Sequence, residues 1–355
     1  MPDTLQNAID SIEPVSRQNL DRAQAHLDSL TKPPGSSGRL EELARRYAAI
    51  KGTRSPKVRG KTIFVFTADH GVTEEGVSAY PAEVTSQMVE NFLNGGAAIN
   101  VLAKHAGIEV LVVDMGVNGD FDPSSPGLLT KKIARGTQNM VRGPAMTRQQ
   151  AEEAIQTGID LAQDAAQRGI DIIGTGDMGI GNTTSASAIM SVCGNCSPEE
   201  TTGRGTGIDD DTLAKKINAI KQAIRTNRPD ASDPVDVLSK VGGFEIGGIA
   251  GLILGAAASR TPVVVDGLIS GAGAVLAIKL NPTATDYIFT SHQSQEPGHK
   301  VFFELLGRPP LFDFGMRLGE GTGSALAIHL LEASVKVYSE MASFQEAGVS
   351  GKNDE

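Results

Sequence analysis

Short apolar runs alternate with segments of helical length through most of this chain, and each run ends in glycine and polar residues. Runs of this kind predict buried strands. Strand, glycine-rich loop and helix in regular alternation are typical of a parallel sheet wrapped by helices, so we predict an α/β fold with a Rossmann-like sheet. The predicted strands cover residues 62–67, 110–114, 170–174, 262–266 and 287–290, and the helices between them 84–104, 148–168, 211–226 and 267–280.

The two ends of the chain lack this alternation. From residue 3 to about residue 50 apolar residues recur at helical spacing, with a break at the turn of residues 32–35, and helical spacing returns over 321–341. We therefore predict a small helical domain of residues 1–50 and about 321–355, and a large α/β domain of residues 51–320. Ligands bind beyond the carboxyl ends of parallel strands, so the large domain should hold an active site built from several distant loops.

The charge balance limits the partners of this chain. It carries 32 Lys and Arg against 42 Asp and Glu, a formal net charge of −10. This excess opposes attraction to phosphate backbones and anionic lipid, so we expect neither nucleic acid nor a membrane as a partner. The first residues lack the basic and apolar regions of a secretory signal, which predicts a cytoplasmic protein. The two cysteines, Cys193 and Cys196, are interpreted as free thiols.

A glycine-rich stretch at residues 174–179, GTGDMG, fits the pattern G-x-G-x-x-G directly after a predicted strand. Backbone N–H groups at the start of the helix that follows favour an anion, which indicates a phosphate or mononucleotide site. A dinucleotide site would also need an acidic residue at the end of the next strand. In this chain the acidic residues at that distance lie in a predicted loop and not at the end of a strand. The alternative is that these glycines only permit a tight turn. A second stretch, 202–207, precedes a helix bearing Lys215 and Lys216. It leaves the same choice, between an anion site to which a lysine adds charge and a flexible loop.

Glu320 stands between two glycines in the segment RLGEGTG, directly before an alanine- and leucine-rich region. The flanking glycines would let a ligand approach the carboxylate closely. Burial would raise the carboxyl pKa toward the range that suits a general base near neutral pH. Glu320 is therefore the candidate catalytic base, and the alternative is that it caps the helix that follows.

Histidine and cysteine patterns give little support to a metal site. His70 and His292 each follow a predicted strand, but neither lies in a tight ligand spacing such as HExxH, and the single C-x-x-C has no second pair. We predict structural hydrogen bonds for these histidines and no metal. The sequence contains neither a Walker loop nor a G-x-S-x-G elbow, so ATP hydrolysis and acyl transfer by a serine lose their usual support.

Five blocks of sequence carry a family resemblance. Between residue 32 and about residue 327 the chain reads, in order, KPPGSSGRLEELA, ADHGVTEEGVSAYPAEVT, GDMGIGNTTSASA, KVGGFEIGGIAG and MRLGEGTGSALA. Together these blocks resemble the nicotinate-nucleotide–dimethylbenzimidazole phosphoribosyltransferases, the enzymes that build the lower nucleotide of cobamides. They span most of the chain, and their combination is highly specific.

The resemblance implies a reaction. Such enzymes transfer the phosphoribosyl group of nicotinate mononucleotide to 5,6-dimethylbenzimidazole with inversion at C1′, giving α-ribazole 5′-phosphate and nicotinate for the nucleotide loop of cobalamin. The donor has no pyrophosphate leaving group, so magnesium is not chemically required and no cofactor is expected. The family is described as homodimeric, which makes a homodimer the expected assembly.

The resemblance also assigns residues. The catalytic Glu of the RLGEG motif falls on Glu320. The contacts on the nicotinate side fall on Asp177, where the family often has Glu, on Gly179 and on Lys216. Further candidates for substrate binding are Gly176, Asn182 and Ser291 near these motifs, with Tyr80 and either Gln87 or Met88 as walls of the pocket for the incoming base.

Two functions of other classes stay open on the sequence alone. A nicotinamide-dependent oxidoreductase rests on residues 174–179 and predicts NADH binding. A nucleotide-sensing binding module rests on the helical ends and the glycine-rich loops, and it predicts saturable mononucleotide binding without turnover. Within the transferases a preference for adenine or a phenolic base stays open, because the base pocket is the region hardest to align.

Overall fold

The computed structural model describes residues 2–350, and these residues include a six-stranded sheet in which every pair of neighbours is parallel. The strand order, β3-β2-β1-β4-β5-β6, is that of a doubly wound Rossmann-type sheet, so the predicted fold class is confirmed. The strands are β1 (Gly60–Ala68), β2 (Glu109–Gly116), β3 (Leu128–Thr130), β4 (Ile170–Met178), β5 (Val263–Val265) and β6 (Ile288–Thr290).

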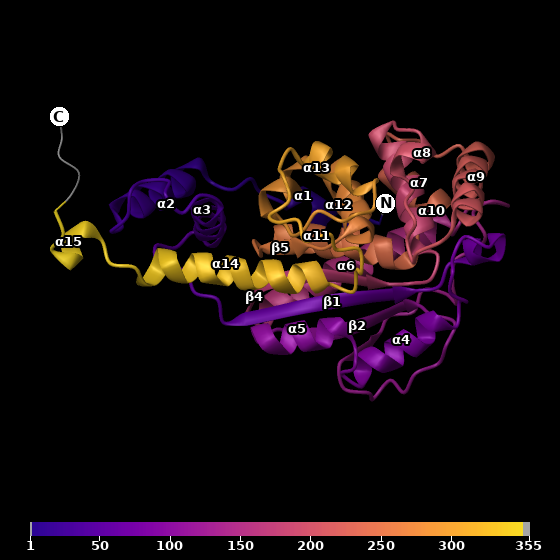
Figure 1. Cartoon of the computed structure of the whole chain (residues 1–355), viewed down its shortest axis with the longest axis horizontal. Coiled ribbons are helices and arrows are strands. Elements are labelled where there is room, and N and C mark those ends of the chain that lie inside the picture. The colour runs from indigo at the N-terminus through magenta and orange to yellow at the C-terminus, as the bar shows by residue number, and fades with distance from the viewer. Residues whose placement is uncertain (1, 351–355) are drawn as a thin grey trace.

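Helices cover both faces of this sheet (Figure 1). On one face lie α6 (Arg148–Gln167), α11 (Phe244–Ala258) and α12 (Leu268–Leu280), and on the other α5 (Ala98–Ala106) and α14 (Thr322–Glu340). The remaining helices are α1 (Asp3–Asp10), α2 (Arg17–Ser29), α3 (Arg39–Lys51), α4 (Val84–Leu93), α7 (Asn182–Gly194), α8 (Pro198–Thr201), α9 (Asp210–Asn227), α10 (Pro234–Val241), α13 (His299–Leu306) and α15 (Phe344–Ala347), with short 3₁₀ helices η1 (Gly71–Glu75) and η2 (Pro282–Tyr287).

Helix α11 is buried almost throughout and packs on α6 through small residues. A Cβ atom added at Gly251 would lie 1.8 Å from the carbonyl oxygen of Ile155, and one at Gly158 would lie 2.0 Å from that of Gly248. The two backbones therefore touch where no side chain fits. Helix α11 is thus a central helix of the core. No helix within residues 2–350 is long and apolar enough to cross a membrane.

The largest differences from the sequence prediction concern β4, the segment 84–104 and β3. Strand β4 continues to Met178, so Gly174 and Gly176 lie inside the strand and not in a loop after it. The helix predicted over 84–104 is two helices, α4 and α5, because the chain turns at residues 94–97, where Gly95 adopts a φ of +75°. The short edge strand β3 has no counterpart in the prediction, since three residues carry too little pattern to recognise.

The helical ends of the chain pack in two places. Helix α1 contacts α6 and α11, whereas α2, α3 and the end of α14 share a separate apolar cluster that includes Leu27, Ala48 and Tyr338. The first turns of α14 lie on the sheet, where Ile328 packs over Gly174. Helix α14 thus contacts both parts of the chain. The division into residues 1–50 with 321–355, and 51–320, stays a prediction, and residues 351–355 lie outside the described part.

Candidate active site

A cavity of about 530 Å³ opens at the carboxyl end of the sheet. It lies where the order of connection reverses, between β1 and β4, which is the usual ligand site of doubly wound sheets. Its walls combine segments far apart in the sequence, as predicted. The lining residues relevant to the chemistry are Tyr80, Met88, Asp177, Gly179, Asn182, Thr183, His292, Glu296, Arg317 and Glu320.

Glu320 is held in a strained backbone conformation at the edge of this cavity. Its φ is +63°, and the glycines on either side, Gly319 and Gly321, are also left-handed. Left-handed backbone is unfavourable for a residue with a Cβ atom and persists only where the surroundings impose it. Such strain is common at functional sites.

The carboxyl group of Glu320 is adapted to proton transfer near neutral pH. Burial, followed by the negative charge of Asp266, raises its pKa to about 7, and the backbone N–H of Ile99 opposes this only in part. One carboxylate oxygen, Oε2, is buried and has no hydrogen-bond partner among the described residues. A buried oxygen of this kind is available to accept a proton from a ligand. Helix α14 begins at Gly321 without a side-chain cap of its own, so the capping role considered for Glu320 is not observed.

Asp177 lies at the end of β4 beside Glu320. Its Oδ2 accepts a hydrogen bond from Asn182 Nδ2 at 3.1 Å, and its Oδ1 is buried with no partner within residues 2–350. Burial, followed by the charges of Asp266 and Glu245, raises the pKa of this carboxyl well above its usual range. A protonated Asp177 can donate a hydrogen bond into the cavity, whereas Glu320 can accept one.

Lys216 lies behind the cavity wall and not in it. Its ammonium group donates to Thr183 Oγ1 at 2.8 Å and to the carbonyl of Gly203 at 3.3 Å. Burial lowers the Lys216 pKa to about 8, and the nearby carboxylate of Glu296 opposes that shift. Glu296 in turn accepts the N–H of Gly205 at 2.8 Å. The predicted lysine therefore reaches the cavity through Thr183 and the second glycine-rich stretch.

Gly176 and Gly179 lie where a side chain would clash with neighbouring backbone atoms. A Cβ at Gly179 would lie 2.3 Å from the carbonyl oxygen of Ala68, and one at Gly176 would lie 2.7 Å from that of Glu320. Gly179 lines the cavity, whereas Gly176 is a strand residue on which the Glu320 loop rests. Ser291 does not line the cavity, since its buried hydroxyl donates to the Asp266 carbonyl at 3.1 Å.

The side chains predicted to contact the incoming base differ in whether they line the cavity. Tyr80 and Met88 line the cavity, together with Val84 and Leu318. Gln87 is exposed on α4 and is not among the lining residues, so of the two alternatives the structure places Met88 in the wall. The cavity thus has an apolar side along α4 and an acidic side formed by Asp177 at the end of β4, Glu296 after β6 and Glu320 before α14.

The two histidines after strands have different surroundings. His70 is fully paired, with Nε2 2.6 Å from Glu245 Oε1 and Nδ1 3.1 Å from Ser185 Oγ, which agrees with the predicted structural role. His292 lines the cavity, with Nδ1 3.2 Å from Ser291 Oγ. Within residues 2–350 no group of three or more His, Cys, Asp or Glu side chains is arranged to hold a metal ion.

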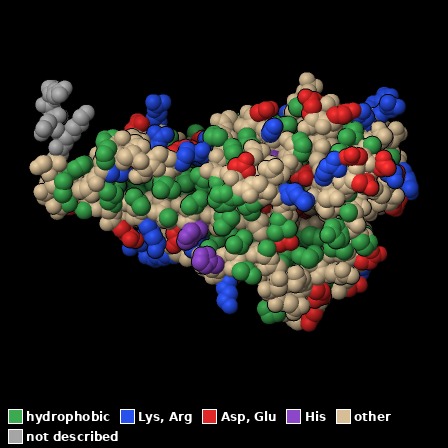
Figure 2. All heavy atoms as spheres, in the orientation of Figure 1, with side chains coloured by type: hydrophobic (Ala, Val, Ile, Leu, Met, Phe, Trp, Pro, Cys, Tyr) green, Lys and Arg blue, Asp and Glu red, His purple; other side chains and the backbone are tan. Residues whose placement is uncertain are grey.

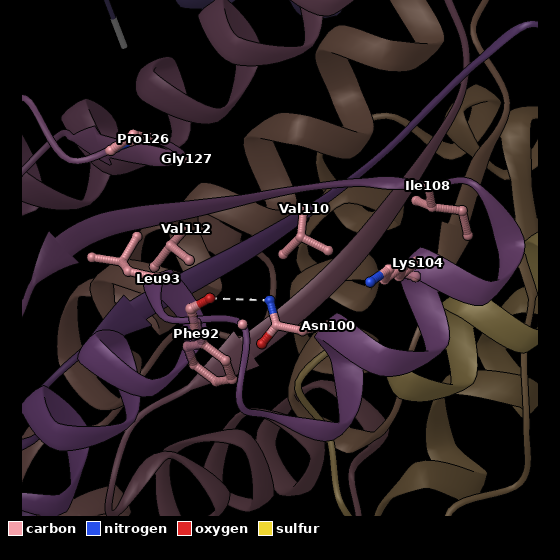
Figure 3. A pocket seen from close by; sticks show the side chains of 11 residues that line it. Phe92, Leu93, Asn100, Lys104, Ile108, Val110, Val112, Pro126 and Gly127 are labelled. Atoms are coloured by element: carbon pink, nitrogen blue, oxygen red, sulfur yellow. Dashed lines mark hydrogen bonds between the residues drawn. The ribbon is translucent and has the colours of Figure 1, made fainter.

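A second cavity, of about 370 Å³, lies between α4, α5 and β2 (Figure 3). Its walls are mainly apolar, and Asn100 Nδ2 donates to the Phe92 carbonyl at 3.0 Å across one side. Of the side chains that line it, Lys104 is the only ionisable one. Because it offers no acid and base together, we place the reaction in the first cavity.

Sequence reasoning missed two residues of the cavity wall, Glu296 and Thr183, and one residue behind it, Asp266. Asp266 follows β5, Glu296 follows β6, and Thr183 opens α7. The first two could have been found by listing acidic residues at or after the carboxyl ends of predicted strands. Thr183 gave no such signal, since a threonine in the first turn of a helix is common without function.

Comparisons with known proteins agree with this geometry. Residues 12–349 match the sequence model of a family described as "Phosphoribosyltransferase", so the chain is an enzyme of that class. A curated relative from Geobacter sulfurreducens is 56% identical over 346 residues, covering 98% of each chain, and one from Pelodictyon phaeoclathratiforme is 55% identical over 355 residues, covering 100% of each. Both are named nicotinate-nucleotide–dimethylbenzimidazole phosphoribosyltransferase. The chain belongs to this family.

A solved relative extends the agreement to three dimensions. The crystal structure of CobT from Thermus thermophilus matches with a TM-score of 0.89 and 45% identity, covering 94% of this chain and 99% of that one. The resemblance seen in the five sequence blocks is confirmed. The oxidoreductase and binding-module alternatives are therefore set aside.

Proposed function

We propose that this chain transfers the phosphoribosyl group of nicotinate mononucleotide to 5,6-dimethylbenzimidazole, with inversion at C1′, giving α-ribazole 5′-phosphate and nicotinate in cobalamin nucleotide-loop assembly. The observation that carries the proposal is a buried carboxyl group, Glu320, whose pKa is raised to about 7 at the wall of the main cavity. The names of the curated relatives support the choice of substrates.

In the proposed reaction the unprotonated ring nitrogen of the benzimidazole attacks C1′ from the face opposite the nicotinate. The bond between C1′ and the pyridinium nitrogen breaks, and its electron pair stays on that nitrogen, which becomes neutral. The other benzimidazole nitrogen loses its proton to Glu320 as positive charge develops. A positioned base of this kind contributes roughly 10²- to 10⁴-fold, and no second proton donor is required.

Binding of the donor is the proposed role of the residues around Asp177. A protonated Asp177 orients the nicotinate side, and Gly179 and Asn182 flank it in the cavity wall. Lys216 offsets the charge of the donor's phosphate or carboxylate from behind Thr183, to which it donates a hydrogen bond. Tyr80 and Met88 are the proposed contacts of the benzimidazole.

Purified protein incubated with nicotinate mononucleotide and 5,6-dimethylbenzimidazole should release nicotinate and α-ribazole phosphate in equal amounts. Both products are measured by chromatography with mass detection. Adenine and a phenol, offered in parallel, test the alternative bases. Product only from one of these would move the assignment to that base. No product from the whole panel would refute the proposed reaction.

Donor affinity should weaken as the pH rises, because the Lys216 pKa is lowered to about 8 and its charge is lost above that value. Between pH 7 and pH 9 the Kd for nicotinate mononucleotide, measured by calorimetry, should rise about tenfold, as the protonated fraction falls. Lys216→Met should weaken binding at pH 7 and remove most of this pH dependence.

The neighbouring Lys215 provides a matched control, because it is exposed on the same turn of α9. Lys215→Met should bind the donor as the wild type does at both pH values. A wild-type Kd that is the same at pH 7 and pH 9 would contradict a charged role for Lys216.

We also propose that the chain works as a homodimer in the cytoplasm. Hydrophobic side chains gather on the face where α5 and α14 lie (Figure 2), and Val101 and Val337 on these helices are 64% and 38% exposed. Both cysteine thiols are free, as suits a reducing compartment. Sedimentation velocity should give twice the mass of one chain, and a single-chain mass would oppose the dimer.

A further inference from the structure

The first turn of α14 is capped from another part of the chain. Its N-cap residue, Gly321, has no side chain to accept the free N–H groups of that turn. The carboxylate of Asp266, at the end of β5, accepts the N–H of Gly321 at 2.9 Å and that of Ser324 at 3.1 Å. Asp266 is completely buried, so these contacts are its principal partners along with the N–H of Gly323.

This cap fixes the residue that precedes the helix. Glu320 is joined to Gly321, so the hydrogen bond from Gly321 to Asp266 restrains the backbone of Glu320. Its left-handed φ of +63° needs such an external restraint, because an isolated chain favours other conformations. Gly176 of β4 packs directly against the Glu320 carbonyl group, so there is no room for a side chain at this position.

The same contact brings the Asp266 carboxyl group beside Glu320. Burial raises the Asp266 pKa, whereas His292 and the N–H groups of the α14 first turn oppose that shift by favouring its charged form. The titratable side chains around the pair are Asp177 at the end of β4, His292 after β6 and, behind Asp177, Glu245 of α11. His292 Nδ1 is 3.9 Å from Asp266 Oδ1. From α5 the Glu320 carboxylate receives the backbone N–H of Ile99. Of the charged neighbours, Asp266 contributes most to the raised pKa of Glu320.

We infer that Asp266 is a positioning residue for the base: it caps α14 from the neighbouring strand, holds Glu320 in its strained conformation, and keeps a negative charge next to it. This inference rests on the proposed role of Glu320. Without the Asp266 charge, Glu320 would be ionised at lower pH and would be a weaker base. Asp266 therefore affects both the backbone geometry of the Glu320 loop and the proton affinity of the Glu320 carboxylate.

Asp266→Asn tests this directly. An amide has one acceptor oxygen, so it cannot serve all the N–H groups that Asp266 receives, and it carries no charge. The titration of Glu320 is followed by NMR of protein labelled with ¹³C in the Glu carboxyl groups, with Glu320→Gln used to assign the signal. We expect the midpoint to fall by about one pH unit or more in Asp266→Asn. In the transfer reaction we expect a loss of about 10- to 100-fold in kcat and an equal downward shift of the acid limb of kcat/KM.

Asp114→Asn is the matched control. Asp114 is also a buried carboxylate at the end of a parallel strand, β2, and it accepts the N–H groups of Gly116 at 3.1 Å and Val117 at 2.9 Å. It does not line the cavity. Asp114→Asn should lower the thermal midpoint much as Asp266→Asn does, but leave the Glu320 titration and the pH profile unchanged.

The two readouts separate the inference from the proposed function. If Asp266→Asn loses stability as Asp114→Asn does while Glu320 titrates as in the wild type, Asp266 is only a structural cap and the inference is wrong. If wild-type protein shows no transfer but the Glu320 signal shifts in Asp266→Asn, the contact acts as inferred and the proposed reaction fails instead.

Discussion

Glu320→Gln should lower kcat by roughly 10²- to 10⁴-fold, the usual contribution of a positioned base, while the KM for nicotinate mononucleotide changes little. Glutamine keeps the volume and the hydrogen-bonding shape of the side chain but cannot accept the proton. Steady-state kinetics with both substrates give the two constants separately. In the wild type kcat/KM should fall as the pH drops below about 7, because protonated Glu320 cannot act as a base.

Stability distinguishes lost chemistry from lost folding in this variant. A carboxyl whose pKa is raised by folding destabilises the native state once the pH exceeds its unfolded value, so replacing it with a neutral amide removes that cost. At pH 8 we therefore expect Glu320→Gln to unfold at or above the wild-type temperature. Glu83→Gln, an exposed change beside α4, is the control for both measurements. Turnover close to wild type in Glu320→Gln would exclude Glu320 as the base.

Gly251→Ala should cause the largest loss of stability among single methyl additions in the core. The new Cβ would lie 1.8 Å from the Ile155 carbonyl oxygen and 2.7 Å from its carbonyl carbon, and both are backbone atoms of α6. The helices must separate, which costs about 1–3 kcal/mol or more, against a helix-propensity gain of up to about 1 kcal/mol. Calorimetry or circular dichroism should show a lower thermal midpoint.

Gly143→Ala is the comparison for this effect, because a Cβ there meets nothing within 4 Å. It should unfold at the wild-type temperature. If Gly251→Ala were as stable as Gly143→Ala, the two helix backbones would not be in contact at this point, and the packing described for α6 and α11 would be wrong.

The sheet could be predicted because its strands are buried on both faces and therefore read as continuous apolar runs. β1, β2 and β4 were found in this way, although the end of β4 was placed too early. GTGDMG resembles a loop by composition, yet Gly174 and Gly176 are strand residues that make room for Ile63 and for the Glu320 loop. The sequence alone does not distinguish a glycine required for close packing from one required for a turn.

The site could be predicted only as far as local patterns and family motifs reach. Glu320 has a local pattern, a carboxylate between two glycines, and Asp177 and Lys216 came from the resemblance. Asp266 lies at the end of a predicted strand, but its role could not be predicted, because it comes from a contact with residues more than 50 positions away. Similarly, Gln87 and Met88 are neighbours in sequence, and only the orientation of α4 distinguishes the exposed one from the one in the wall.

The cavity wall is built from segments that are far apart in the sequence, so substrate binding depends on the complete fold. Tyr80, Asp177, His292 and Glu320 belong to segments that the sheet alone brings together, so no partly folded fragment contains a complete binding site. A ligand that needs all of these segments binds the native state and not its locally opened forms. Saturating substrate should therefore slow hydrogen exchange most at the amides of the central strands, which exchange only through global unfolding. Exchange of the amides in α2 and α15, which open by local fraying, should be unchanged.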